Sequence, residues 1–159
     1  MVLVDFRMPG ALHGWVAVND GVMGGHSSGA LVPCTGGAAF TGRVSFEDGG
    51  GFASVRASRR DWPTAGARGF ALQVRGDGGR YRYTLRGEDG IQYQAGFTGG
   101  ADWATIELPL ADFVPRHRGR TLAGAPPLVP GAIRTLGFLI ADRQSGPFQL
   151  EIASIATRP

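Results

Sequence analysis

The feature that most constrains the fold of this chain is a hydrophobic pattern that repeats at every second residue. In the run GFALQVRG the apolar set is Phe70, Leu72 and Val74, and the runs GGRYRYTLRG and GIQYQAGFTG alternate similarly on either side of the turn-forming sequence GEDG. A period of two indicates β-strands, whereas an amphipathic helix would repeat about every 3.6 residues. Breaker residues recur roughly every eight to twelve positions, which is typical of a β-sandwich or barrel.

Other runs extend this all-β prediction to about eight to ten mostly antiparallel strands. In AAFTGRVSF the alternation predicts that Phe40, Val44 and Phe46 face inward. DWATIELPL ends in Pro109, which has no N–H to donate and therefore belongs at a strand end or on an edge strand. The segment 113–131, FVPRHRGRTLAGAPPLVPG, is long and irregular, and we expect a functional loop or a strap packed on the surface.

The length of the chain limits it to one hydrophobic core. With 159 residues, of which 43% are hydrophobic, we expect a single domain over residues 1–159. Cys34 is the sole cysteine, so no disulfide can form within the chain. The first residues lack the pattern of a signal peptide, and no apolar run reaches the roughly 18 residues of a membrane span. These features predict a cytoplasmic protein that is not transmembrane.

The positive charge of the chain comes from arginine alone. All 16 basic residues are arginine and the formal net charge is +3. A composition without lysine is what a GC-rich genome produces, and the basic runs at 59–60 and 116–120 are short. They are not interleaved with the aromatic residues that a base-stacking surface requires, so we expect no binding of nucleic acid.

The stretch WVAVNDGVMGGHSSGALV, residues 15–32, has apolar ends and a glycine-rich middle. A phosphate-binding loop would lead into a helix N-terminus, but ALVPC follows here and has no helical continuation. Asp20, Asn19 and the carbonyls near Gly21 could supply oxygen ligands to a structural calcium ion. The simpler interpretation is a turn in which the Asp20 carboxylate caps nearby amides. We therefore expect no cofactor, and Asp20 is the candidate if a metal binds.

Catalytic groupings are weak in this sequence. His13, His26 and His117 lie far apart and none has the spacing of a zinc site. No G-x-S-x-G elbow surrounds a serine, and Cys34 beside Pro33 is expected to be a half-buried thiol at a strand end.

Carboxylate chemistry is the other enzymatic alternative. A glycoside hydrolase needs two converging carboxyl groups, and Glu107, Glu151 and Asp142 are the candidates. The sequence does not bring them together, so we expect a protein without enzymatic activity.

A set of polar residues occupies the less apolar side of several predicted strands. If those strands pair in one sheet, they form a face of guanidinium and amide groups that could bind a glycan or a protein surface, although an ordinary solvated sheet face has the same pattern. The set comprises Gln73, Arg75, Arg82, Gln92, Gln94, Thr105, Glu107, Gln149 and Glu151.

Several motifs in family order resemble the complex I intermediate-associated protein 30 family, known in mitochondria for an assembly factor of NADH:ubiquinone oxidoreductase. They are WVAVNDGVMGGHSSG, FTGRVSFEDGGGFASVR, RGDGGRYRYTLR, YQAGF, DWATIELPLADFVPRHRGR and IRTLGFLIADRQSGPFQLEIASI, which run from about Trp15 to Ile155. The resemblance implies a galactose-binding-like jelly-roll β-sandwich and a role in binding or assembly, here as a stand-alone bacterial form.

The resemblance and the polar strand faces together give the candidate residues for binding a ligand or partner. The motif positions are Asp20, Met23, Gly24, Gly25, Ser27, Arg56, Asp77, Arg118 and Asp142, and the strand faces add Arg82, Gln92 and Gln94.

The resulting hypothesis is an assembly-factor or chaperone module that binds a protein partner, such as a subunit of a complex I-like respiratory complex at the inner membrane. Arg118 would contact carboxylates, and Trp62, Phe113 or Pro115 would give apolar contact area. The alternative is a carbohydrate-binding module, which needs Trp62 or Tyr93 as an exposed aromatic platform.

Overall fold

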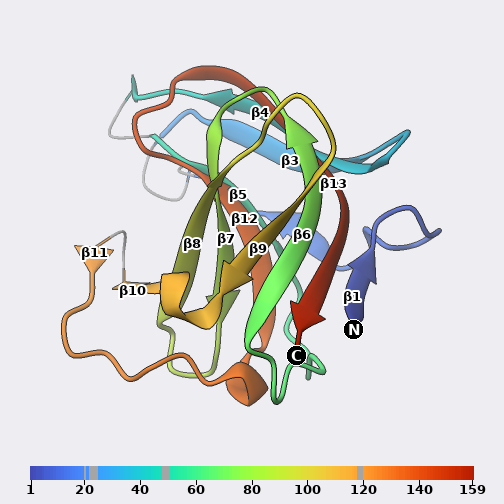
Figure 1. Cartoon of the computed structure of the whole chain (residues 1–159). Coiled ribbons are helices and arrows are strands. Elements are labelled where there is room, and N and C mark those ends of the chain that lie inside the picture. The colour runs from blue at the N-terminus through green and yellow to red at the C-terminus, as the bar shows by residue number, and fades with distance from the viewer. Residues whose placement is uncertain (20, 22–24, 48–50, 118–119) are drawn as a thin grey trace.

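The computed structural model describes residues 1–19, 21, 25–47, 51–117 and 120–159 (Figure 1). These residues form two antiparallel β-sheets stacked as a sandwich, together with the 3-10 helices η3 (Leu110–Asp112) and η4 (Pro130–Ala132). The expected all-β jelly-roll sandwich is confirmed.

One sheet has six strands, with β13 at its centre. Strand β13 pairs with both β4 and β6, and β1 also pairs with it. The strands are β1 (Val2–Asp5), β3 (Ser28–Cys34), β4 (Gly37–Val44), β6 (Gly69–Gly76), β9 (Ala104–Pro109) and β13 (Gly146–Arg158). Pro109 ends the edge strand β9, as predicted.

The other sheet has seven strands in the order β11-β10-β8-β7-β12-β5-β2. They are β2 (Trp15–Ala17), β5 (Ala53–Ala57), β7 (Arg80–Arg86), β8 (Gln92–Thr98), β10 (Val114–His117), β11 (Arg120–Thr121) and β12 (Thr135–Ile140). The predicted hairpin of tyrosine-rich strands is the β7–β8 pair, in which Tyr83 lies opposite Ala95.

The described residues contain thirteen strands, more than the alternation predicted. The additional strands are short: β1, β2, β10 and β11 have four, three, four and two residues. Strands of this length show too little alternation to be recognised. The segment 113–131 is accordingly less irregular than expected, because it contains β10, β11 and η4.

Aromatic rings from the two sheets meet in the core. Phe40 of β4 lies against Tyr81 of β7, with ring centroids 6.2 Å apart, and Phe70 of β6 lies against Tyr83 of β7 at 5.4 Å. Such pairs contribute about 0.5–1.5 kcal/mol beyond the burial of their area. The prediction for Phe46 was wrong: it is 47% exposed because β4 ends at Val44 and the alternation does not continue.

The two core tyrosines differ in what their hydroxyl groups contact. The Tyr81 hydroxyl donates to Asp77 Oδ1 at 2.9 Å, whereas the buried Tyr83 hydroxyl has no hydrogen-bond partner among the described residues. We expect Tyr81→Phe to lower the free energy of unfolding by about 1–2 kcal/mol, because it removes a bond to a carboxylate. Tyr83→Phe should leave it unchanged or raise it by up to about 1 kcal/mol. Urea unfolding of both variants measures the contrast, and equal losses would contradict it.

Candidate functional site

The outer face of the seven-stranded sheet gathers guanidinium and amide side chains from four strands, β5, β7, β8 and β10. Directly paired residues of an antiparallel sheet point to the same side. One row runs from Arg56 through Gly137 and Thr84 to Gln94. We call this surface the arginine face, and it comprises Arg56, Arg82, Thr84, Arg86, Gln92, Gln94 and Arg116.

Part of the arginine face is a hydrogen-bonded chain. The Arg82 guanidinium pairs with Asp142 and donates from Nη1 to Gln94 Oε1 at 2.7 Å. Gln94 in turn donates from Nε2 to Gln92 Oε1 at 2.6 Å. Asp142 follows β12 with a φ of 60°, a left-handed conformation that aspartate tolerates better than most residues. These contacts fix the positions of Arg82 and both amides.

The remaining arginines of the face lack such partners. No ion pair among the described residues includes Arg56, Arg86 or Arg116. The Nε atoms of Arg86 and Arg116 are buried without a hydrogen-bond partner there. Burial, and secondarily the charge of Arg56, lower the pKa of Arg86. The face therefore carries positive charge that the described residues do not neutralise.

Gly137 leaves space at the centre of the arginine face for the side chains on the two neighbouring strands. A Cβ at this position would lie 2.6 Å from the Val55 carbonyl oxygen and 2.7 Å from Thr84 Oγ1. It would also lie 3.2 Å from the Cβ of Arg56. The missing side chain thus gives the Arg56 and Thr84 side chains their room over β12.

The structure brings five of the twelve predicted binding residues together at the arginine face. These are Arg56, Arg82, Gln92, Gln94 and Asp142.

Two other candidates lie elsewhere and make structural contacts. Ser27 Oγ accepts from Ser45 N at 2.9 Å. The Asp77 carboxylate accepts from Gly79 N, Tyr81 Oη and Gln149 N, so it ties the β6–β7 turn to β13. Gly25 lies in the segment before β3, and the other predicted positions, Asp20, Met23, Gly24 and Arg118, lie outside the described residues.

The strands that carry the polar residues do not pair in one sheet, so these residues do not form one face. Gln73, Arg75, Thr105, Glu107, Gln149 and Glu151 belong to the six-stranded sheet, while Arg82, Gln92 and Gln94 belong to the seven-stranded sheet. Alternation reports the side of a strand on which a residue lies, but not the sheet to which the strand belongs.

The aromatic residues predicted as contact surface are also in the core. Trp62, Phe113 and Tyr93 are 7%, 7% and 6% exposed. Trp62 donates from Nε1 to the Arg134 carbonyl, and the Tyr93 hydroxyl donates to the Pro126 carbonyl. Neither Trp62 nor Tyr93 therefore provides the exposed platform that a carbohydrate-binding module would need.

A second polar cluster lies on the outer side of the six-stranded sheet. Arg75 pairs with Glu151, and its guanidinium lies 4.9 Å from the ring centroid of Trp103. Cys34 is half-buried at the end of β3, as predicted, and burial raises the pKa of its thiol. A raised pKa disfavours the nucleophilic thiolate.

The carboxylates considered for hydrolysis do not converge. Glu107 lies opposite Ala71 and Glu151 opposite Arg75 on either side of β6, which places their Cα atoms roughly 16 Å apart. Glycoside hydrolases hold the two carboxyl groups within about 10 Å. Glu107 pairs with Arg158, and Asp142 belongs to the other face.

The part of the chain that the structure describes has neither a cluster of metal ligands nor a membrane-spanning helix. No group of three or more His, Cys, Asp or Glu side chains there could hold a metal ion. No described helix is long and apolar enough to cross a membrane.

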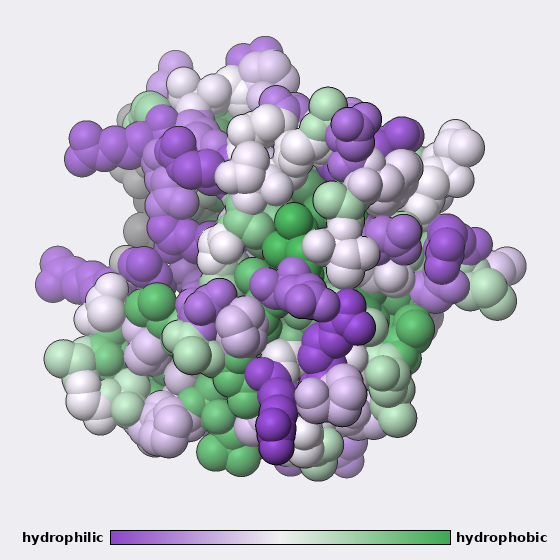
Figure 2. Space-filling view, viewed as in Figure 1, coloured by the Kyte–Doolittle hydropathy of each residue, from purple (hydrophilic) through white to green (hydrophobic). Residues whose placement is uncertain are grey.

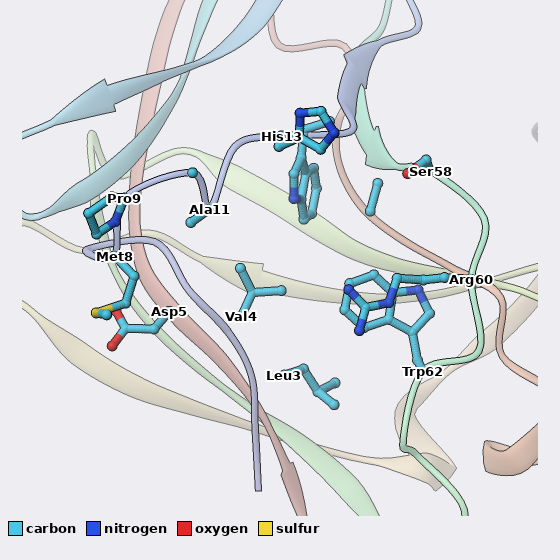
Figure 3. Close-up of a pocket in the computed structure, with 13 residues that line it drawn as sticks. Leu3, Val4, Asp5, Met8, Pro9, Ala11, His13, Ser58, Arg60 and Trp62 are labelled. Atoms are coloured by element: carbon cyan, nitrogen blue, oxygen red, sulfur yellow. The ribbon is translucent and has the colours of Figure 1, made fainter.

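A pocket of about 410 Å³ lies between the N-terminal segment and the residues that follow β5 (Figure 3). Asp5 and Met8 lie on one side, and Arg60 lies across Trp62 on the other, 4.3 Å from the ring centroid. The Asp5 carboxylate is already hydrogen-bonded to Arg7, which lowers its pKa. Among the residues predicted as contact surface, Trp62 lines this pocket.

Sequence reasoning missed two of the four arginines of the arginine face. Arg86 shares the phase of Arg82 in β7, so the alternation itself could have identified it. Arg116 was hidden because it lies in β10, a short strand interrupted by Pro115.

The two stacked sheets form a jelly-roll β-sandwich of galactose-binding-like architecture. Solved structures with this fold include the family 11 carbohydrate-binding module of the cellulosomal cellulase Lic26A-Cel5E of Clostridium thermocellum, with a TM-score of 0.68 and 18% identity over 100% of this chain and 94% of that chain. The same kind of module in complex with a beta-1,3-1,4-mixed-linked tetrasaccharide gives a TM-score of 0.65 and 18% identity over 99% of this chain and 94% of that chain. Identities this low show the fold alone.

The family is shown by the sequence. Residues 4–152 match the model of the Complex I intermediate-associated protein 30 (CIA30) family, and the chain belongs to that family. A mouse relative, "Complex I intermediate-associated protein 30, mitochondrial" of Mus musculus, is 34% identical over 89 residues, which cover 51% of this chain and 27% of the mouse protein. The match thus spans about a quarter of that relative.

The Arg75–Glu151 pair predicts a pH dependence of stability. The hydrogen bond from Arg75 lowers the pKa of Glu151, so the pair stabilises the fold above the unfolded-state pKa of about 4.3. This contribution is lost as the pH falls through the lower folded-state pKa. We expect Glu151→Gln to be less stable than wild type at pH 7, and the two unfolding free energies to converge in strong acid. A difference that does not vary with pH would contradict this assignment.

Proposed function

We propose that this protein is a non-enzymatic assembly module that binds a subunit of a complex I-like respiratory complex through its arginine face, without a cofactor. The observation that carries this proposal is a group of guanidiniums without an ion-pair partner among the described residues, Arg56, Arg86 and Arg116, on the outer side of one sheet. Membership of the CIA30 family supports the choice of client. The module would work in the cytoplasm, beside the inner membrane through its partner.

The composition of the arginine face suits recognition of a protein surface. Arginine offers a planar fork of donors and is enriched at interfaces, and amides add both donors and acceptors. Val114 and Val16 lie on flanking strands of the same sheet and are 36% and 53% exposed. They give the polar centre an apolar border.

Other apolar surface lies away from this face. In Figure 2, hydrophobic groups gather at the lower left, over the segment between β11 and η4, where Val129 is 59% exposed. Hydrophilic side chains interrupt the rest of the visible surface. A partner could extend its contact from the sheet to this segment.

Carbohydrate binding is the second candidate, because one solved structure of the same fold is a complex with a tetrasaccharide. Sugar rings stack on exposed aromatic faces, and among the large hydrophobic side chains of the described residues the exposed aromatic one is Phe46. It lies beyond the end of β4, outside the arginine face. A glycan array separates the candidates: we expect no hits, and reproducible hits lost in Phe46→Ala would favour the carbohydrate reading.

Affinity purification from the native host tests the assembly role. The bait is the tagged chain, compared with Val114→Glu, which puts a carboxylate beside Gln94 on the arginine face. The matched control is Val32→Glu, an exposed valine of edge strand β3 in the other sheet. We expect respiratory subunits with wild type and the control, and about tenfold less with Val114→Glu. Absence of respiratory subunits from every purification would remove the proposal.

A further inference from the structure

Arg86 and Arg116 form a matched pair within the arginine face. Both lie opposite Gln92 of β8, one on each side, so their side chains project from the same side of the sheet. Two strand spacings separate their Cα atoms by about 9.6 Å. The Gln92 amide lies between them, and its oxygen already accepts from Gln94.

Arg56 adds a third guanidinium to this pair. It lies on β5, and β12 separates it from β7, which carries Arg86. Gly137 directly opposite Arg56 has no side chain to block the space between them. The pairings put both arginines on the same side of the sheet, and the positive charge of Arg56 adds to burial in lowering the pKa of Arg86.

The nearby described carboxylates are already engaged. Glu88 pairs with Arg59 and Arg134. Asp89 Oδ1 accepts from Ile91 N at 3.1 Å. Asp142 pairs with Arg82. A partner's anion would therefore relieve repulsion without breaking any of these contacts.

We infer that Arg56, Arg86 and Arg116 bind the carboxylates of an acidic, extended segment of the protein partner. This inference rests on the proposed function, and it names the chemistry of the segment that docks there. In an extended segment, every second side chain points to the same side, and these side chains lie about 6.6–7 Å apart. The Cα atoms of Arg86 and Arg116 are about 9.6 Å apart, and their long side chains can converge to match that spacing. Bidentate arginine–carboxylate bonds satisfy the fork that each guanidinium presents.

Other ligand chemistries fit this site less well. A neutral glycan would leave the guanidinium charges uncompensated. Single-stranded nucleic acid needs exposed aromatic side chains for base stacking. The tyrosines of β7 and β8, Tyr81, Tyr83 and Tyr93, are instead buried in the core. An acidic peptide supplies charge and needs no stacking surface.

Direct titration with a synthetic probe tests this inference. The probe is a fluorescein-labelled peptide of alternating glutamate and threonine, and its control replaces each glutamate with glutamine. We expect the wild-type chain to bind the glutamate peptide only, with an affinity that falls as salt rises. Arg86→Gln and Arg116→Gln should each weaken binding about tenfold. Arg43→Gln, an equal charge change at an exposed position of β4, should change it less than twofold.

The outcomes decide between the two levels of the proposal. Thermal unfolding first establishes that each variant is folded, and Arg56→Gln serves as an additional variant if one of the others is not. Glutamate-peptide binding that Arg43→Gln weakens as much as the face variants would overturn the site. Binding of inorganic phosphate without binding of the peptide would also overturn it. If the protein binds the peptide but recovers no respiratory subunit, the acidic-segment site stands and the assembly role is rejected. If it recovers respiratory subunits but does not bind the peptide, the assembly role stands and the acidic-segment site is rejected.

Discussion

The packing of Tyr81 and Tyr83 against Phe40 and Phe70 determines which side of the seven-stranded sheet faces outward. In β7 these tyrosines alternate with Arg82 and Arg86, so burying the rings necessarily directs the two arginine side chains to the opposite side of the sheet. A slip of one residue would bury the charges and expose the rings. The core and the candidate site are therefore set by the same alternation in one strand.

The electrostatics of the arginine face differ from those of the six-stranded sheet. On the six-stranded sheet Arg75 is paired with Glu151 of the neighbouring strand β13, and Arg158 is paired with Glu107 of β9, on the far side of β6. On the arginine face Arg82 alone has a carboxylate among the described residues, although Arg86 and Arg116 bury their Nε atoms. Burying an unpaired donor lowers stability, and departures of this kind are expected at functional sites. This contrast favours the seven-stranded sheet as the binding surface.

The sequence predicts the fold well where alternation is long and poorly where strands are short. Strands β6, β7 and β8 were predicted because their apolar residues have to line the core. The short β10 was not, since Pro115 and the neighbouring prolines resemble a loop. Trp62 and Phe113 lie outside long alternating runs, so their burial depends on tertiary packing that no local pattern reveals.

The site was predictable only in part for a related reason. Period two identified Arg82, Gln92 and Gln94 as outward-facing, but it also grouped them with Glu107 and Glu151, which lie on another sheet. Deciding between the sheets requires knowing that β7 pairs with β8 and β12 while β13 pairs with β4 and β6. Those pairings join segments far apart in the chain, and a single sequence does not encode them locally.

The most direct test of the central claim is NMR observation of the arginine Nε–Hε groups while the glutamate–threonine peptide is added. Because all 16 basic residues are arginine, these signals report on every cationic side chain of the protein. We predict that Arg56, Arg86 and Arg116 shift together and saturably, while Arg43 and Arg75 do not. Shifts confined to arginines of the six-stranded sheet, or spread evenly over all arginines, would contradict an acidic-segment site on the arginine face.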